Sequence, residues 1–351
     1  MSEILDSMLA SMPDSYQKTV GFPTYDILAA AALRLIETEG RLEDVKSKLD
    51  PENLSGPELD AYIEPRSGQI RNPATYAVGV LQVTGTGTIM EGDLFESGGG
   101  IQFAATETVT ISGSGTVRIQ CVQPGAVGNL PAGSITMMPV QIAGIVSVSN
   151  SDTTHDGYDE ETDEAYYKRF LLRIQTPPTC GNVYHYMEWA LEVSGVGGVQ
   201  VYPLGHGSNS VDVVIIDTDG VPASSTLVDA VQDHIDPGSS GLGNGEAPIG
   251  AYCYVSAATA VTLALSVKIT TVQGAVQDDV TQSIKNAVKA YLKSIAFKQS
   301  YVSVAQIAAA ILNSDGVLDY ENLTVNGGTA NISVDDRDVA VLGEVTITYA
   351  A

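Results

Sequence analysis

The spacing of the apolar residues changes along the chain, and this change constrains the fold more than any other feature. Between residues 24 and 50, leucines recur every seven positions, which is a helical spacing. Residues 71–150 instead form short runs separated by glycines, and Val117, Ile119 and Cys121 alternate with polar residues as in a half-buried strand. On size alone, a chain of 351 residues suggests roughly two or three domains, and the pattern changes character between the first two segments.

We predict an α+β, multidomain fold with four regions. They are an N-terminal helical region (1–70), a small all-β domain (71–150), an α+β domain (151–258) and a C-terminal α+β domain (259–351). In the third region, Asn182 is expected to cap a helix, and Pro177 and Pro178 to end the helix before it. In the fourth, Ser303 caps a helix, and the helices are expected to lie on one face of a small antiparallel sheet.

The leucine repeat of the first region is a candidate subunit-interaction seam. It consists of Leu28, Leu35, Leu42, Val45 and Leu49. The pattern is about three heptads long, Gly40 interrupts it, and Pro51 is expected to end the helix. Two interpretations remain open, because the same stripe suits packing inside its own domain and pairing with a helix of another subunit.

The net charge of −25, from 17 basic and 42 acidic residues, excludes broad classes of partner. Such a surface repels nucleic acid and anionic membranes, and no run of basic residues predicts a local exception. The acidity favours solubility, or complementarity to a basic protein. No stretch of about 18 apolar residues predicts membrane insertion.

The cysteines and the first residues indicate where the protein folds. Three cysteines, far apart and odd in number, argue against a disulfide framework or a zinc site and favour a reducing compartment. The first residues, MSEILDSMLASMPDSY, are acidic where a signal peptide is basic. We therefore expect the protein to be made in the cytoplasm.

No motif predicts a catalytic, cofactor or metal site. The acidic cluster from Asp156 to Glu164 lacks the alternating spacing of a calcium loop and better suits a helix N-terminus. The stretch from Asp217 to Gly220 is interpreted as a turn, the four histidines as isolated, and the glycine clusters as tight β-turns. The sequence leaves open whether scattered residues converge on a triad, but it favours a structural component of a large assembly.

Five stretches, taken in order, resemble the baseplate J-like proteins of contractile phage tails and phage-derived tail particles. The first three are GPELDAYIEPRSGQIRNPATYAVGVLQVTG, GTIMEGDLFESGGGIQFAA and GAVGNLPAGSI. The last two are VSNSDTTHDGYDEETDEAYYKRFLLRI and WALEVSGVGGVQVYP. One departure stands out: the paired glycine that the family has before the acidic helix is Asp156-Gly157 here.

The resemblance implies a structural baseplate wedge subunit that links the central hub of a phage tail, prophage element or bacteriocin-like particle to its peripheral parts. It implies two copies per wedge with a smaller wedge protein, six wedges per ring, and no enzymatic activity or cofactor. An alternative is a receptor- or glycan-binding tail protein, for which the few aromatic residues of 71–150 offer little support. A tail-associated hydrolase is a further alternative.

Overall fold

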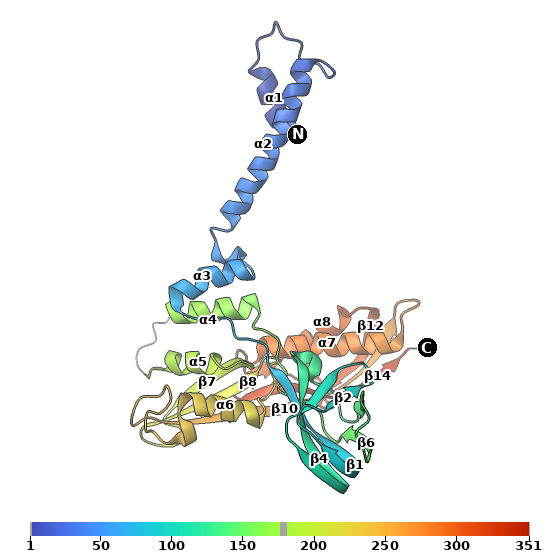
Figure 1. Ribbon diagram of the computed structural model, residues 1–351. Coiled ribbons are helices and arrows are strands. Elements are labelled where there is room, and N and C mark those ends of the chain that lie inside the picture. Colours follow the sequence, from blue (N-terminus) through green and yellow to red (C-terminus); the bar gives the residue numbers. More distant parts are fainter. Residues whose placement is uncertain (1, 176–180, 351) are drawn as a thin grey trace. The chain divides into compact units, whose positions relative to one another are not determined.

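The computed structural model describes residues 2–175 and 181–350, and the chain forms two compact units, Met1–Ile70 and Arg71–Ala351 (Figure 1). The predicted helix end at Pro177 and Pro178 lies outside the described residues, as does Cys180. Each unit is described by itself. The mixed α+β, multidomain class predicted from the sequence is confirmed.

The first unit is helical, as its heptad spacing predicts. It contains α1 (Ser2–Ala10), α2 (Pro23–Ser47), a 3-10 turn (Pro51–Asn53) and α3 (Pro57–Ser67). Proline stands in the first turn of α2 and of α3, where its missing N–H leaves no bond unmade. α1 packs beside the first part of α2, and Leu5 and Ala32 are buried.

The second unit begins with a six-stranded sheet in the order β5-β2-β3-β4-β1-β6. Its strands are β1 (Tyr76–Ile89), β2 (Leu94–Ser97), β3 (Gln102–Ala105), β4 (Val109–Pro124), β5 (Ile135–Met137) and β6 (Ile145–Asn150). The end strands β5 and β6 lie side by side, and the buried Asn150 side chain accepts a hydrogen bond from the Ile135 N–H at 2.9 Å. The sheet is therefore a nearly closed barrel around an apolar core that includes Leu81, Phe95 and Phe103.

Two glycine clusters expected in tight turns lie within long strands instead, so that expectation is wrong for them. Residues 85–88 belong to β1, and residues 113–116 belong to β4. Gly144, which faces the first of these clusters, shows one reason for glycine where two backbone segments meet. Its carbonyl accepts a hydrogen bond from the Thr86 N–H at 2.7 Å, and a Cβ atom on Gly144 would collide with the Thr86 carbonyl oxygen. Glycine here allows backbone to approach backbone.

A three-stranded sheet, β7-β8-β9, follows the barrel. Its region comprises α4 (Asp163–Gln175), α5 (Val183–Leu191), β7 (Val196–Pro203), β8 (Ser210–Asp217), α6 (Ser225–Ile235), a 3-10 turn (Pro237–Ser239) and β9 (Tyr252–Ala257). Asn182 caps α5 as predicted, by accepting a hydrogen bond from the His185 N–H. The central strand β8 is buried on both faces, since Val213 and Ile215 join one core cluster and Val214 and Ile216 another. The sequence pattern did not predict β9.

The C-terminal sheet has the order β12-β10-β14 and is mixed rather than antiparallel. Its region comprises β10 (Thr259–Thr271), α7 (Gln277–Ile295), β11 (Tyr301–Val302), α8 (Val304–Leu312), β12 (Val317–Val325), β13 (Ile332–Ser333) and β14 (Asp338–Tyr349). The expected antiparallel arrangement is wrong for β14, which pairs with β10 in parallel. β12 runs antiparallel to β10, and its last residue lies beside the first half of β10. The chain then crosses to the other edge of β10, and β14 therefore starts near the start of β10 and runs parallel to it.

Two helices cover the C-terminal sheet, as the sequence predicts. α7 lies against β14 and α8 against β12. Buried residues recur on α7 at the expected spacing: Val280, Ile284, Val288 and Leu292. Ser303 caps α8 by accepting a hydrogen bond from the Gln306 N–H.

Gly144→Ala tests the close approach at the barrel rim. Gly133→Ala is the matched control, because Gly133 has a similar positive φ but open space at its Cβ position. We expect the control to lose about 1–2 kcal/mol for the left-handed backbone. Gly144→Ala should lose at least about 2 kcal/mol more, because its Cβ meets backbone. Urea unfolding measures both, and equal losses would contradict the packing described.

Candidate interaction surface

The predicted seam on α2 is exposed over most of its length. Leu28 is half-buried, whereas the side chains of Leu35, Leu42 and Val45 are 45%, 54% and 59% exposed. Ion pairs border this face, with Arg34 bonded to Glu37 at 2.8 Å and Lys46 to Glu43 at 2.5 Å. A row of exposed large apolar side chains on one face of a helix is typical of a surface that a partner covers.

Leu49, the last predicted seam residue, lies beyond α2. The helix ends at Ser47 with Lys48 as its C-cap, four residues before Pro51. Leu49 is 79% exposed and follows this cap. The helical part of the seam therefore ends at Val45. Gly40 does not interrupt α2, which continues through it.

Carboxylates of the acidic cluster between β6 and α4 bond to other segments of the chain. The buried Glu161 carboxylate accepts two hydrogen bonds from Arg169, at 2.9 and 2.7 Å, and one from the Asn72 N–H at 3.0 Å. Asp163, in the first turn of α4, forms an ion pair with Arg71 at 2.7 Å. Each of these carboxylates has a positive or backbone N–H partner, which fits the interpretation of the cluster as a helix N-terminus.

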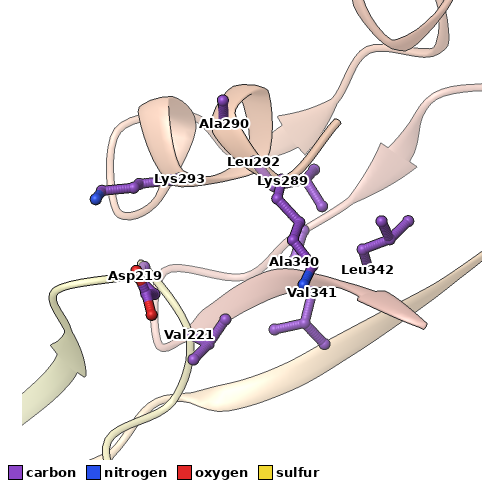
Figure 2. A pocket seen from close by; sticks show the side chains of 10 residues that line it. Asp219, Val221, Lys289, Ala290, Leu292, Lys293, Ala340, Val341 and Leu342 are labelled. Atoms are coloured by element: carbon purple, nitrogen blue, oxygen red, sulfur yellow. The ribbon is translucent and has the colours of Figure 1, made fainter. Parts of the chain in front are cut away.

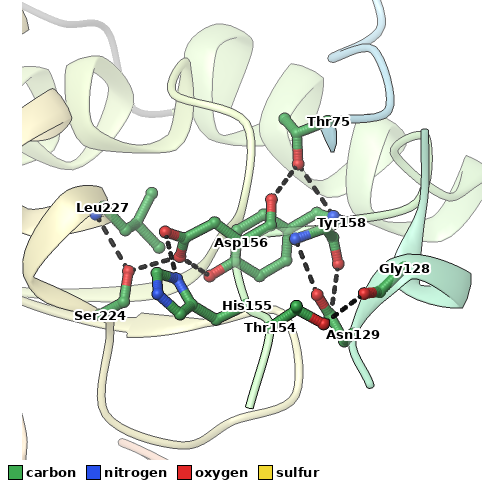
Figure 3. Close-up of polar contacts among 10 residues, drawn as sticks. Thr75, Gly128, Asn129, Thr154, His155, Asp156, Tyr158, Ser224 and Leu227 are labelled. Carbon is green, nitrogen blue, oxygen red and sulfur yellow. Dashed lines mark hydrogen bonds and ion pairs between the residues drawn. The ribbon is translucent and has the colours of Figure 1, made fainter. Parts of the chain in front are cut away.

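Asp156, which departs from the family's paired glycine, is the centre of a second polar network (Figure 3). Its φ of +64° lies in the left-handed region, where a residue other than glycine is strained. One carboxylate oxygen accepts a hydrogen bond from Ser224 Oγ at 2.5 Å, and the other lies 2.7 Å from His155 Nδ1. Thr75 Oγ1 donates to its carbonyl oxygen at 2.6 Å. These bonds stabilise the strained turn and connect the end of the barrel to the start of α6.

The network brings serine, histidine and aspartate together, yet their order is unsuited to nucleophilic catalysis. A nucleophilic serine donates to the imidazole, which the carboxylate orients from its other side. Here the Ser224 hydroxyl donates directly to Asp156 and accepts the Leu227 N–H at 3.1 Å as the N-cap of α6. Burial and the nearby Asp156 raise the pKa of the Tyr158 hydroxyl, so it keeps its proton and does not act as a base.

The other histidines and the described cysteines also have local structural roles. His206 Nδ1 lies 2.7 Å from Asp212, and His234 Nε2 lies 3.0 Å from Glu192. Burial raises the pKa of the Cys253 thiol to about 12, which keeps it protonated. In residues 2–175 and 181–350 no group of three or more His, Cys, Asp or Glu side chains is placed to hold a metal ion. In the same ranges, no helix is long and apolar enough to cross a membrane.

The stretch from Asp217 to Gly220 is a turn, as predicted. One Asp217 carboxylate oxygen accepts hydrogen bonds from the N–H groups of Asp219 and Val221, at 2.9 and 3.1 Å. Burial raises the pKa of Asp217 to about 6, and these backbone bonds offset only part of that rise. The charged form of Asp217 therefore costs stability at neutral pH.

Sequence comparison identifies three consecutive domains. Residues 80–157 match the Baseplate J-like protein barrel domain, residues 178–257 the Baseplate J-like central domain, and residues 263–348 the Baseplate J-like protein C-terminal domain. The first match covers the strands that form the nearly closed barrel. The other two correspond to the β7-β8-β9 sheet and the β12-β10-β14 sheet with their helices.

Individual relatives extend the likeness over the whole chain. The Phage-like element PBSX protein XkdT of Bacillus subtilis is 30% identical over 345 residues, covering 98% of this chain and 96% of that protein. The Baseplate protein gp47 of Escherichia phage Mu is 29% identical over 154 residues, 42% of this chain and 43% of that protein. A chain of the anti-feeding prophage baseplate, solved by cryo-EM, aligns with a TM-score of 0.40 and 12% identity over 98% of this chain and 91% of that one.

Substitution of Asp156 separates its hydrogen bonds from its backbone strain. Asp156→Ala loses the bonds and keeps the strain, so unfolding should cost about 2–4 kcal/mol less. Asp156→Gly loses the bonds but relieves the strain, and we expect it to recover about 1 kcal/mol. Urea midpoints measure this order. The exposed Asp233 of α6, changed to Ala, is the control and should change stability by less than about 0.5 kcal/mol.

Asp217→Asn should stabilise the protein at pH 7.5. Asparagine keeps the oxygen that accepts both N–H groups and removes the buried charge. Since the folded pKa lies above the unfolded value of 3.8, ionisation destabilises the fold progressively as pH rises from about 4 to about 6. Urea unfolding should show a gain of about 1–2 kcal/mol at pH 7.5 that vanishes below about pH 4. An equal gain at both pH values would exclude the charge as its cause.

Proposed function

This chain belongs to the baseplate J-like protein family and is a baseplate structural protein; from that premise we propose that it is a wedge subunit of a contractile tail. In this role it links the central hub to peripheral parts through protein–protein contacts. The exposed apolar row Leu35, Leu42 and Val45 on α2 is the observation that supports the proposal most directly. Burial of each such side chain against a partner contributes about 1.5–3 kcal/mol.

The proposed role includes partners, location and domain organisation. Two copies of the chain join a smaller wedge protein, and six such units close a ring, as the family resemblance implies. The chain is made in the bacterial cytoplasm and assembles into the baseplate of a phage or tail-like particle. We further propose the division into regions 1–70, 71–150, 151–258 and 259–351, each with a surface for a different neighbour.

The alternative of a receptor- or glycan-binding tail protein has little support in the barrel. Glycan sites commonly use exposed aromatic rings, whereas Phe95 and Phe103 are fully buried and Tyr76 alone is exposed among the aromatics of residues 71–150. We propose no enzymatic activity, because Ser224 bonds the Asp156 carboxylate and the His155 imidazole bonds Asp156 rather than the serine.

The first test compares self-association with and without the seam. We expect Leu35→Ser/Leu42→Ser, and a chain lacking residues 1–50, to have a lower mass than the full chain by light scattering across a concentration series. Ile27→Ser/Leu33→Ser is the matched control, because both residues are exposed on the same helix but off the heptad. A mass unaffected by all of these changes would exclude the seam as a self-association surface.

The second test identifies partners. Affinity capture of the full chain from cells that express the surrounding phage-related genes, followed by mass spectrometry, should recover a smaller wedge protein together with hub proteins. The Leu35→Ser/Leu42→Ser variant should lose the wedge protein first. Recovery of the chain alone, combined with binding to cells or glycans, would favour the receptor-binding alternative and contradict the wedge role.

A further inference from the structure

The basic residues of the second unit divide into two groups. Within residues 71–175 and 181–350, Arg71, Lys168, Arg169, Arg173, Lys268 and Arg337 each form an ion pair with a carboxylate. The structure records no ion pair among these described residues for Arg118, Lys285, Lys289, Lys293 and Lys298. In a chain with 42 acidic residues, four unpaired lysines on one short stretch are unexpected.

These lysines form a stripe on α7. Lys285, Lys289 and Lys293 are spaced by four residues and share one face, and Lys298 follows the helix end. The helix dipole favours a cation only in the last turn, which accounts for Lys293 but not for Lys285 or Lys289. Like charges four residues apart destabilise a helix, so the stripe has a cost that folding alone does not explain. The sequence contains no basic run here because helical spacing separates the lysines.

Two lysines of the stripe, Lys289 and Lys293, line a groove between α7 and β14 (Figure 2). The groove has a volume of about 490 Å³. Its lining combines apolar side chains, including Val221, Ala290 and Leu342, with Lys289, Lys293 and Asp219. Figure 2 shows the Lys289 side chain reaching from α7 towards β14. Lys293 and Asp219 lie at the other end of the groove. Glu164 is also near, since Lys168 and then Lys298 and Lys293 lower its pKa, but it already bonds Lys168.

The opposite corner of the same sheet has the complementary character. Leu318 on the edge strand β12 is 62% exposed, and Asp315, Asp319 and Glu321 around it are exposed. Asp319 pairs with Thr270 of β10, whereas Ala340 of the groove pairs with Val261. About nine residues of strand separate the two corners, which is roughly 30 Å, and they lie on opposite edges. Leu318 and Asp319 therefore cannot reach the groove within a single chain, whereas Asp315 lies beside the first half of α7, where its N–H donates to Ser283 Oγ at 3.0 Å.

We propose that the α7–β14 groove binds the Leu318 corner of a second copy of this chain. Leu318 enters the apolar part of the groove, and Asp315 and Asp319 meet Lys289 and Lys293. The contact is heterologous, with different surfaces on the two copies, so it extends from copy to copy and closes where the rotation permits. Nucleic acid is disfavoured as an occupant, because the net charge of −25 opposes a long polyanion.

The proposal rests on the proposed function, in which several copies meet in one ring, but its test is separate. Mixed ¹⁴N and ¹⁵N full-length chains are treated with a carbodiimide, which joins an amine to a carboxylate in direct contact. We expect isotopically mixed peptides that connect Lys289 or Lys293 to Asp315 or Asp319. Lys293–Asp219 and Lys293–Glu164 links are expected within one chain and carry a single isotope.

Charge-swapped variants make the test specific. Lys289→Glu/Lys293→Glu and Asp315→Lys/Asp319→Lys should each reduce self-association through this contact by about tenfold or more, measured by sedimentation. A mixture of the two variants should restore it, because each supplies the charge that the other needs. Leu318→Ser should weaken association without changing its salt dependence. Arg118→Glu, an exposed unpaired residue of β4, is the control and should have no effect.

Different outcomes separate this inference from the wedge role. Absence of mixed cross-links, or no recovery in the mixture of swapped variants, would overturn the groove proposal even if affinity capture recovers wedge and hub proteins. Cross-links from Lys289 or Lys293 to a different captured protein would assign the groove to that partner and overturn it too. If isotopically mixed cross-links form but affinity capture recovers no other baseplate protein, the groove contact between copies is supported and the wedge role is contradicted.

Discussion

The second unit depends on the carboxylates that join the beginning and the end of the barrel. The chain enters the barrel through Arg71 and Asn72 and leaves it towards α4, and the Glu161 and Asp163 carboxylates connect these two segments. Arg169 is buried and Glu161 is largely buried, so water solvates the charges of this pair poorly. Removing one partner of such a pair typically costs about 3–5 kcal/mol, because the other charge remains buried. The bonds from Arg71 and Asn72 to these carboxylates hold the start of α4 against the segment that enters the barrel.

Other carboxylates of the acidic cluster are also bonded within the protein. Asp159 accepts a hydrogen bond from the Ala126 N–H at 2.9 Å, and Asp156 accepts one from the Ser224 hydroxyl. With these oxygens satisfied inside the protein, the cluster has a structural role. The residues left for interaction with partners are those that internal packing does not use: the apolar row on α2 and the lysines of α7. Both suit a protein whose function is assembly.

Local chemistry allowed several elements to be predicted correctly. Asn182 and Ser303 cap helices because their side chains accept N–H groups that a helix start leaves unpaired. The apolar spacing of α7 and the alternation in β10 also match their buried faces. The predictions that failed concern pairing. Whether β14 runs parallel to β10, and whether residues 85–88 turn or continue in β1, depends on segments far away in the sequence.

The sequence by itself determined the class of the fold, the family and the position of an apolar row, since period, caps and ordered motifs are local properties. It also excluded recognisable metal and nucleotide motifs. Only the tertiary structure decided that Leu35, Leu42 and Val45 remain exposed, that Ser224 bonds the Asp156 carboxylate instead of an imidazole, and that Lys289 and Lys293 line one groove. The physical reason is that exposure, hydrogen-bond order and charge clustering depend on which distant segments pack together, and a local pattern does not specify that.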